Sequence, residues 1–256
     1  MDLGLKDKKV LITGGSKGIG LACAKAFIAE GARVALVSRS EENLKKANLK
    51  GAFTLAVDLT DAAAAAAMVE RVEKEFGPLD VLVNSAGAAK RTDADDLTPA
   101  AWRAGMDAKY FSYINVMDPV IKRMGKRGHG AVINIIGNGG KVASPTHLAG
   151  GAANAALLLA TAGLAYAYAS KGVRVVGVSP GVTKTERVAE GLKAEAKRAN
   201  LSEEQAYKQM ISRLPMGRPA EPEEIADIVV FAASERGRYL TGANISTDGA
   251  ASHVVV

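Results

Sequence analysis

The stretch Thr13-Gly14-Gly15-Ser16-Lys17-Gly18-Ile19-Gly20 decides the fold expected of this chain. It follows an apolar run, Val10-Leu11-Ile12, and precedes residues 21–30, whose composition is typical of a helix. A strand, a glycine turn and a helix in this order predict a phosphate-binding turn. Glycines let the backbone approach a pyrophosphate closely, and the start of the helix offers free N–H groups. A helix-start turn in another α/β protein is the competing interpretation.

The composition is that of a globular α/β protein. The chain has 256 residues, of which 48% are hydrophobic and 23% charged. The chain has no uninterrupted run of about 18 or more apolar residues that would indicate a membrane span. Residues 1–6 lack the apolar region of a secretory signal. The one cysteine, Cys23, excludes an intramolecular disulfide and is interpreted as a packing residue. We therefore expect a cytoplasmic protein with no membrane partner.

The charge is mildly basic but dispersed. Lys plus Arg total 33 and Asp plus Glu total 27, a formal charge of +6. The densest basic cluster, residues 122–127, falls at an expected helix end, where cations complement the helix dipole. We expect neither a nucleic-acid partner nor a metal site.

Apolar runs alternate with helical stretches along the whole chain. This alternation predicts a doubly wound parallel sheet of about seven strands with helices on both faces, in one domain over residues 1–256. The expected strands are residues 10–12, 33–37, 53–57, 79–83, 131–136, 173–178 and 243–247. The expected helices are residues 21–30, 41–49, 62–76, 102–124, 148–170 and 222–234, with a charged helical insert at about 186–214.

Short motifs at the expected strand ends carry a family resemblance. They are Thr13-Gly14-x-x-x-Gly18-x-Gly20, Asp58, Asn84-Ser85-Ala86-Gly87, Pro180-Gly181-Val182-Thr183-Lys184-Thr185, Met216-Gly217-Arg218-Pro219 and Thr241-Gly242 leading to Asp248-Gly249. In order and spacing they resemble the short-chain dehydrogenase/reductase family over essentially the whole chain. The resemblance implies a Rossmann-type fold, a nicotinamide cofactor across the carboxyl ends of the strands, and a small-molecule substrate. It also implies that residues 186–214 form a substrate lid, and that the helices at 102–124 and 148–170 pair in a symmetric dimer or tetramer.

The end of the second expected strand indicates which cofactor is preferred. NAD-specific relatives carry an acidic residue there, whereas this chain has Ser38-Arg39. Arg39 can bind a 2′-phosphate with its guanidinium fork, Ser38 is a neutral donor, and Lys17 adds a second positive charge. NADP(H) is therefore favoured over NAD(H); the alternative is that both basic side chains are solvated surface charges.

The resemblance also assigns the other cofactor contacts. Asp58 is similar to the residue at the adenine edge, Asn84 and Gly87 to those beside the adenine ribose, and Thr183 and Thr185 to those near the carboxamide and pyrophosphate. The full expected set is Gly14, Ser16, Lys17, Gly18, Ile19, Gly20, Ser38, Arg39, Asp58, Leu59, Asn84, Gly87, Pro180, Gly181, Thr183 and Thr185.

The catalytic pattern of the family is broken. The family uses Asn, Ser, Tyr and Lys, with the tyrosine as proton donor. Counting along the chain places Lys109, Gly137, Gly150 and Asn154 at these four positions. The segment Tyr168-Ala169-Ser170-Lys171 is only superficially similar, because Lys171 precedes the sixth strand and sites of this architecture lie at the carboxyl ends of strands.

Other residues are candidates for acid–base work. Lys109 and His147 can donate a proton, Asn138 and Asn154 can donate amide hydrogen bonds, and the backbone of residues 137–140 can stabilise an oxyanion. Each also has a structural interpretation, as a replacement residue or a loop hydrogen-bonder. Gly150-Gly151 suggests either a larger substrate pocket or a space filled by neighbouring side chains.

Two functions are compatible with these residues. The first is an NADP(H)-dependent oxidoreductase acting on a carbonyl or alcohol with an atypical active site. The second is a sensor or assembly subunit that binds the dinucleotide without turnover. Loss of a general acid costs about 10²–10⁴-fold in rate, so we expect poor turnover of generic ketones. Activity should depend on Lys109, Asn138 or His147.

Overall fold

Seven parallel strands form one sheet in the order β3-β2-β1-β4-β5-β6-β7. The computed structural model describes residues 1–87 and 89–254. Residues 88, 255 and 256, which belong to the expected domain, lie outside the described residues. The strands are β1 (Lys9–Thr13), β2 (Arg33–Ser38), β3 (Phe53–Ala56), β4 (Val81–Asn84), β5 (Gly130–Ile135), β6 (Val173–Pro180) and β7 (Asn244–Thr247). The predicted doubly wound α/β fold is confirmed.

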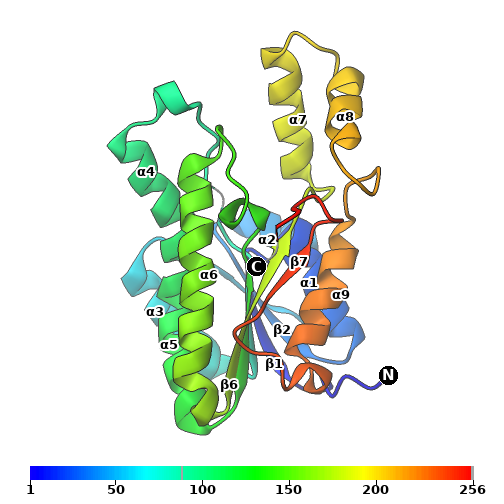
Figure 1. Cartoon of the computed structure of the whole chain (residues 1–256). Coiled ribbons are helices and arrows are strands. Elements are labelled where there is room, and N and C mark those ends of the chain that lie inside the picture. Colours follow the sequence, from blue (N-terminus) through cyan, green and yellow to red (C-terminus); the bar gives the residue numbers. More distant parts are fainter. Residues whose placement is uncertain (88, 255–256) are drawn as a thin grey trace.

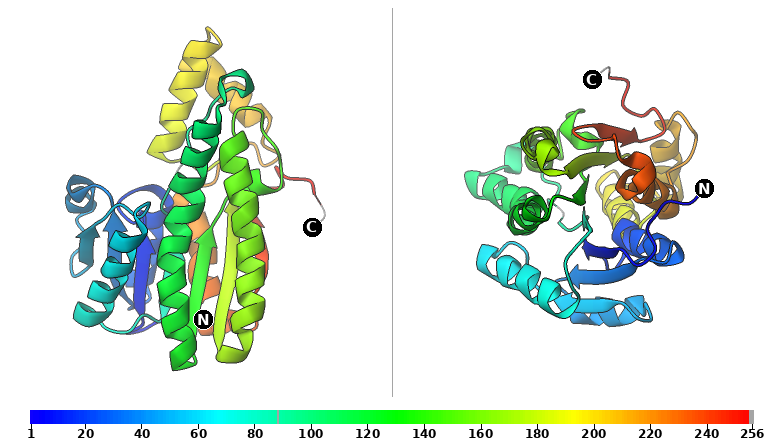
Figure 2. Two further views of the ribbon diagram at one scale, coloured as in Figure 1. Left: turned by 90° about the vertical axis from the view of Figure 1, so that its left-hand side faces the viewer. Right: turned by 90° about the horizontal axis from the view of Figure 1, so that it is seen from below.

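Helices cover both faces of the sheet (Figures 1 and 2). They are α1 (Gly18–Ala29), α2 (Glu41–Ala47), α3 (Ala62–Glu75), α4 (Pro99–Met106), α5 (Ser112–Arg127), α6 (Leu148–Tyr168), α7 (Glu186–Arg198), α8 (Glu203–Ser212) and α9 (Pro222–Ala233). Successive strand side chains point to opposite faces. Val10 and Ile12 therefore join the core with α1 and α9, whereas Leu11 joins the core with α3 and α5. Cys23 is a packing residue, and burial raises the pKa of its thiol to about 12.

The charged insert at 186–214 is helical and consists of two helices, α7 and α8. The chain turns after α7 through Asn200, which has a φ of 52°. Ser202 then starts α8 with a capping box: its Oγ accepts from the Gln205 amide at 3.1 Å, and Gln205 Oε1 accepts from the Ser202 amide at 2.8 Å. Capping satisfies free N–H groups of the new helix. The α7–α8 pair projects beyond the sheet (Figure 1).

The predicted helix at 102–124 is longer and is interrupted. It starts with α4 at Pro99, where Thr98 Oγ1 accepts from the Ala101 amide at 3.2 Å, and it ends with α5. A π-helical turn, Asp107–Phe111, separates α4 from α5. Turns of this type insert one residue into the helical repeat and reorient the side chains around them. Lys109 lies in this turn.

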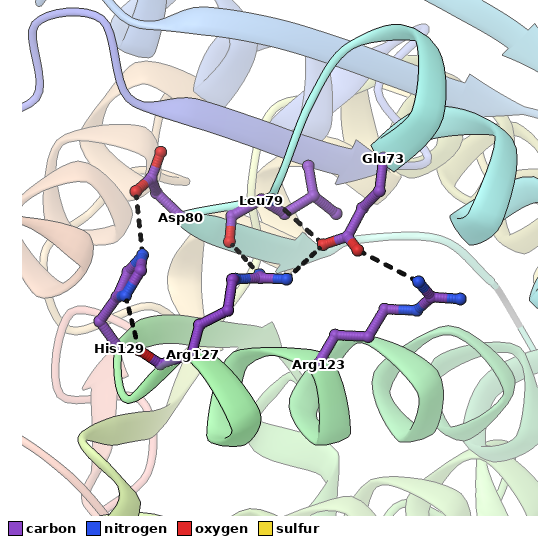
Figure 3. A network of polar contacts seen from close by, with 6 residues as sticks. All are labelled: Glu73, Leu79, Asp80, Arg123, Arg127 and His129. Atoms are coloured by element: carbon purple, nitrogen blue, oxygen red, sulfur yellow. Dashed lines mark hydrogen bonds and ion pairs between the residues drawn. The ribbon is translucent and has the colours of Figure 1, made fainter.

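A polar network ties α3 and α5 together near the amino ends of β4 and β5 (Figure 3). Glu73 accepts from Arg127 at 3.0 Å and from Arg123 at 3.4 Å, and Arg127 also donates to the Leu79 carbonyl at 2.8 Å. His129 Nε2 lies 3.7 Å from an Asp80 carboxylate oxygen. The basic cluster at 122–127 thus supplies partners for Glu73, and its contacts are part of the scaffold.

The helix α6 lies along the sheet. With the turn that follows it, Leu148–Lys171 is long and apolar enough to cross a membrane by length and composition. Ala153 and Leu157 on one side are fully buried, whereas Leu159 and Tyr166 on the other side are exposed. A one-sided burial of this kind is typical of a helix packed on a protein core.

Candidate functional site

The glycine turn after β1 is built for close approach to a ligand. Gly14 has a φ of 65°, and a Cβ added there would lie 2.8 Å from the Ser85 carbonyl oxygen and the Ala86 amide nitrogen. A Cβ at Gly20 would collide with the Gly14 carbonyl oxygen. Lys17 is the N-cap of α1 and makes no side-chain cap hydrogen bond, so the first amides of α1 remain available to an anion. These residues fit the pyrophosphate of a dinucleotide.

A cleft of about 650 Å³ opens from this turn along the carboxyl ends of β1 to β4. It is wide enough for a cofactor-sized ligand. The expected cofactor residues that line it are Gly14, Ser16, Lys17, Gly18, Ile19, Ser38, Arg39, Asp58, Leu59, Gly87 and Thr185. The structure therefore brings most of the expected set together in one place.

Asn84 does not line the cleft as expected, because its side chain is fully buried. Its Nδ2 donates to Asn134 Oδ1 at 3.0 Å, and Asn134 Nδ2 donates to Thr161 Oγ1 at 3.0 Å. Thr13 Oγ1 donates to Asn84 Oδ1 at 3.5 Å. Buried amides need such partners. Asn84 therefore fixes β1, β4, β5 and α6 to one another below the site.

Four more expected residues lie outside the lining of this cleft within the described chain. Gly20 lies in close contact with the Gly14 carbonyl group of the glycine turn, where a side chain would not fit. Thr183 is buried, and its hydroxyl donates to the Gly181 carbonyl at 3.3 Å. A Cβ at Gly181 would lie 2.8 Å from Asp248 Cβ. The Pro180–Thr183 segment therefore packs against the strand β7 side of the fold.

The residues expected to bind a 2′-phosphate, Ser38 and Arg39, line one end of the cleft. Ser16 and Ser38 are joined by a hydrogen bond of 2.9 Å, and Arg39 is exposed beside them. The pKa of Asp58 lies below its ordinary value, because its carboxylate accepts from the Thr60 amide and hydroxyl and because Arg39 is near. No carboxylate pairs with Arg39 among the described residues.

Sequence reasoning missed the cleft residues that come from the π-helical turn and from the start of α7. Ala108 lies in the π-helical turn and Ser112 directly follows it at the start of α5, whereas Glu186 and Arg187 lie in the first turn of α7. Lys17 and Glu186 form an ion pair at 3.8 Å across the cleft. The available signal was Thr185 directly before a charged helical run, since a capping threonine places the next two residues in the first turn of a helix.

Lys109 is buried, and its ammonium faces the interior. Its Nζ donates to Tyr113 Oη at 2.7 Å and to the Ile135 carbonyl at 2.9 Å. The Tyr113 hydroxyl also donates to that carbonyl. Burial, together with the nearby charge of Arg187, lowers the pKa of Lys109 to about 7. The Lys109 ammonium thus donates two of its hydrogen bonds to the protein interior, to Tyr113 and to the Ile135 carbonyl.

His147 fills the space above Gly150. A Cβ at Gly150 would lie 2.6 Å from His147 Nε2 and closer still to Cε1, and a Cβ at Gly139 would lie 3.2 Å from His147 Cδ2. The hypothesis of a larger pocket over Gly150 is therefore wrong, and the alternative of a neighbouring side chain is correct. His147 Nδ1 is buried without a partner in the described part of the chain. Partial burial, followed by the charges of Arg91, Arg187 and Lys109, lowers the pKa of His147 below its ordinary value.

Asn154 reaches the same place from the next turn of α6. Its Nδ2 would lie 3.4 Å from a Cβ at Gly137 or at Gly139, and its Oδ1 is buried with no partner among the described residues. A Cβ at Gly151 would lie 2.9 Å from the Gly139 carbonyl oxygen, so small residues let this turn pack on α6. Buried polar atoms without partners are typical of sites that bind a ligand or water.

The candidate Asn138 and the superficially similar Tyr168–Lys171 segment make their contacts elsewhere. Asn138 Nδ2 donates to Ser252 Oγ at 3.3 Å, so its amide binds the C-terminal segment. Lys171 lies over the Tyr168 ring, with Nζ 4.7 Å from the centroid, and Tyr168 packs on Gly125. This pair lies at the opposite end of α6 from His147 (Figure 1). These contacts join α6 to α5 and lie outside the cleft lining among the described residues.

Residues 14–251 match the family model described as enoyl-(acyl carrier protein) reductase. The chain belongs to the short-chain dehydrogenase/reductase family. Members of this family are oxidoreductases that bind a nicotinamide cofactor, in agreement with the glycine turn and the cleft.

Relatives in the family span the whole chain. A 3α-hydroxysteroid dehydrogenase of Mediterraneibacter gnavus is 33% identical over 258 residues, covering 96% of this chain and 98% of the relative. An acetoacetyl-CoA reductase of Shinella zoogloeoides is 36% identical over 242 residues, covering 93% and 96%. The crystal structure of L-sorbose reductase from Gluconobacter frateurii, complexed with NADPH and L-sorbose, is 28% identical, with a TM-score of 0.93 over 100% of both chains.

Proposed function

We propose that this protein is an NADP(H)-dependent oxidoreductase that interconverts a carbonyl and an alcohol, with His147 as the acid–base residue. One observation carries the assignment: the imidazole occupies the space above Gly150, the position that the family resemblance gives to tyrosine. The imidazole is half-buried and lies beside Gly139, and its own Nδ1 is one of the two unpartnered polar atoms of the site, the other being Asn154 Oδ1.

The charge at the end of β2 supports NADP(H) over NAD(H). Arg39 is exposed beside the Ser16–Ser38 hydrogen bond, and a guanidinium fork suits a phosphate monoester. Two structural relatives were solved with NADPH, the L-sorbose reductase and a variant of actinorhodin polyketide ketoreductase that is 27% identical. Lys17 contributes less than Arg39 in this scheme, because it already pairs with Glu186.

The cofactor supplies or accepts the hydride when bound, and the chain supplies the proton. In the reductive direction, protonated His147 donates a proton from Nε2 to the carbonyl oxygen. In the oxidative direction, the neutral imidazole accepts that proton from the alcohol. The Asn154 amide, which faces the glycine turn, donates a hydrogen bond that holds the imidazole or the substrate oxygen. Gly137, at the serine position of the family, supplies no hydroxyl.

The surrounding elements complete the proposal. The α7–α8 pair acts as the substrate lid, because Glu186 and Arg187 at its start line the cleft. The outer faces of α5 and α6, where Leu159 and Tyr166 are exposed, pair with their copies in a dimer or tetramer.

The test is a screen of carbonyls with NADPH and of alcohols with NADP⁺. His147→Asn should lower kcat/KM by roughly 10²-fold or more, because it removes the proton donor. Asparagine is chosen because it keeps a polar side chain at this position. His129→Asn is the matched control, since His129 lies in the network of Figure 3, away from the cleft. Lys109→Ala and Asn138→Ala test the two other candidates. The rate of reduction should fall as the pH rises through the lowered pKa of His147.

Two outcomes would contradict the proposal. Brisk reduction of generic ketones that survives His147→Asn would exclude the imidazole as proton donor. No turnover across a broad panel, with tight NADPH binding retained, would favour the alternative of a non-catalytic sensor or assembly subunit.

A further inference from the structure

Three cations without carboxylate partners surround His147. They are Arg91 in the loop before α4, Lys109 in the π-helical turn and Arg187 in the first turn of α7. The charge of each acts on the His147 imidazole. None of the three forms an ion pair with a carboxylate in the part of the chain that the structure describes. Cations gathered without partners repel one another, and an anion among them would be stabilised.

The acidic residues nearest in sequence to the two arginines are bound to other cations. Asp93, two residues after Arg91, pairs with Arg198 at 3.2 Å. Glu186, directly before Arg187, pairs with Lys17 at 3.8 Å. Neither carboxylate neutralises the arginine beside it. Among the residues that the structure describes, Arg91 and Arg187 are therefore left without an ion-pair partner.

Hydrogen bonds hold Arg91 next to His147. Its Nη1 donates to Thr146 Oγ1 at 3.2 Å, and the Thr92 amide donates to the Thr146 carbonyl at 3.1 Å. The loop that carries Arg91 is thus fixed to the residue before His147. The Arg91 guanidinium has five N–H donors, and its hydrogen bond to Thr146 uses one of them, so most of the group is available to a ligand.

Arg187 belongs to another element, the first turn of α7. It lines the cleft together with Ala108 and Ser112, and the position of α7 is set by the Thr185 cap, whose Oγ1 accepts from the Val188 amide at 3.4 Å. The two arginines therefore come from two different elements, Arg91 from the loop bound to Thr146 and Arg187 from the start of α7 at the cleft.

We propose that Arg91 and Arg187 bind an anionic group of the substrate, a carboxylate or a phosphate. The substrate is then a carbonyl compound, or its alcohol, that bears this anion, which rests on the proposed function. Arginine suits the role because its planar fork matches both anions with paired hydrogen bonds. Lys109 is buried and adds positive potential without contacting the ligand.

Binding of the anion should also increase the fraction of His147 that is protonated. The charged groups around the imidazole are Arg91, Lys109 and Arg187; the glycine turn at 137–140 and α6 contribute none, and Tyr113 is neutral because burial raises its pKa. All three cations lower the pKa of His147. An anion placed among them offsets this effect, so the pKa rises on binding and the acid needed for reduction is formed.

The first experiment measures binding without turnover. Malonate and inorganic phosphate are titrated separately into the NADP⁺-saturated protein, by calorimetry and by NMR of the His147 ring. We expect binding of at least one anion and a rise in the His147 pKa. Arg91→Gln and Arg187→Gln should each weaken this binding about tenfold, the loss of one charge-assisted contact. Arg71→Gln removes a surface charge on α3 and should leave the binding unchanged.

The second experiment compares matched substrates: acetoacetate with its methyl ester, and dihydroxyacetone phosphate with dihydroxyacetone. The anionic member of one pair should have the higher kcat/KM, and the pair that shows it identifies carboxylate or phosphate. Arg91→Gln and Arg187→Gln should each bring the ratio of kcat/KM for the anionic substrate to kcat/KM for the neutral one toward one. The main cause should be a higher KM for the anionic substrate.

The outcomes separate this inference from the proposed function. Anion binding that depends on both arginines, without any turnover, supports the inference and contradicts the proposed function. No anion binding and equal use of both members of each pair overturn the inference. A fall in NADPH affinity on Arg187→Gln, with anion binding intact, also overturns it, because Arg187 would then bind the cofactor.

Discussion

Lys109→Met should change how the stability of the protein depends on pH. Burial lowers the pKa of Lys109 from 10.5 to about 7, and Arg187 adds to this effect. In the unfolded chain the side chain keeps its ordinary pKa. Between pH 7 and 10.5 the unfolded chain therefore binds more protons than the folded protein, and stability rises with pH across this window.

The size of the effect follows from these two values. Each step of one in pKa corresponds to about 1.4 kcal/mol, so burial of the ammonium costs roughly 4 kcal/mol at pH 7 and about 1 kcal/mol at pH 10. The unfolding free energy of the native protein should therefore rise by about 3 kcal/mol between pH 7 and pH 10 because of Lys109. Methionine has a similar shape and no charge. Tyr113 still donates to the Ile135 carbonyl in the variant, so the fold keeps that contact.

Urea unfolding at pH 7 and pH 10 measures the difference. We expect the gain in unfolding free energy with pH to be about 3 kcal/mol smaller in Lys109→Met than in the native protein. Lys126→Met, an exposed position on α5, is the control and should follow the native pH dependence. The reasoning would be refuted if Lys109→Met and the native protein gained the same stability between the two pH values.

Two further predictions concern the cofactor and the assembly. NADPH should bind more tightly than NADH by titration calorimetry, and Arg39→Asp should reverse much of this preference, because a carboxylate repels the 2′-phosphate; equal affinities in the native protein would contradict the NADP assignment. Light scattering at micromolar concentration should give a dimer or tetramer, and Leu159→Glu should shift it toward monomer, because it places a charge on the exposed side of α6; a native monomer would contradict the pairing of α5 and α6.

The sequence determined the fold and the end of the cleft that the glycine turn forms. Alternating apolar runs and the glycine turn specify strand, turn and helix through local geometry, and the order of these elements fixes a parallel sheet. Residues such as Gly14, Ser16, Ser38 and Arg39 lie at strand ends, so their place in the cleft follows from the topology alone.

The breaks within the expected helical stretches depend on weaker local signals. The break between α7 and α8 needs only Asn200 with a positive φ and the Ser202 cap, which are easily missed inside a charged helical run. The π-helical turn before α5 has no sequence signature of its own, because its hydrogen bonds are decided by the packing around Lys109.

Only the tertiary structure decided where the side chains of the site point. Asn84 comes at the end of a strand like other cleft residues, yet it turns into a buried network because Thr13 and Asn134 on neighbouring strands supply its partners. Arg91 and Thr146 are 55 residues apart in the chain, and only their hydrogen bond in the folded structure places Arg91 beside His147. Periodicity and turn chemistry act over a few residues, whereas burial, pKa and the pairing of charges depend on elements that meet only in the folded chain.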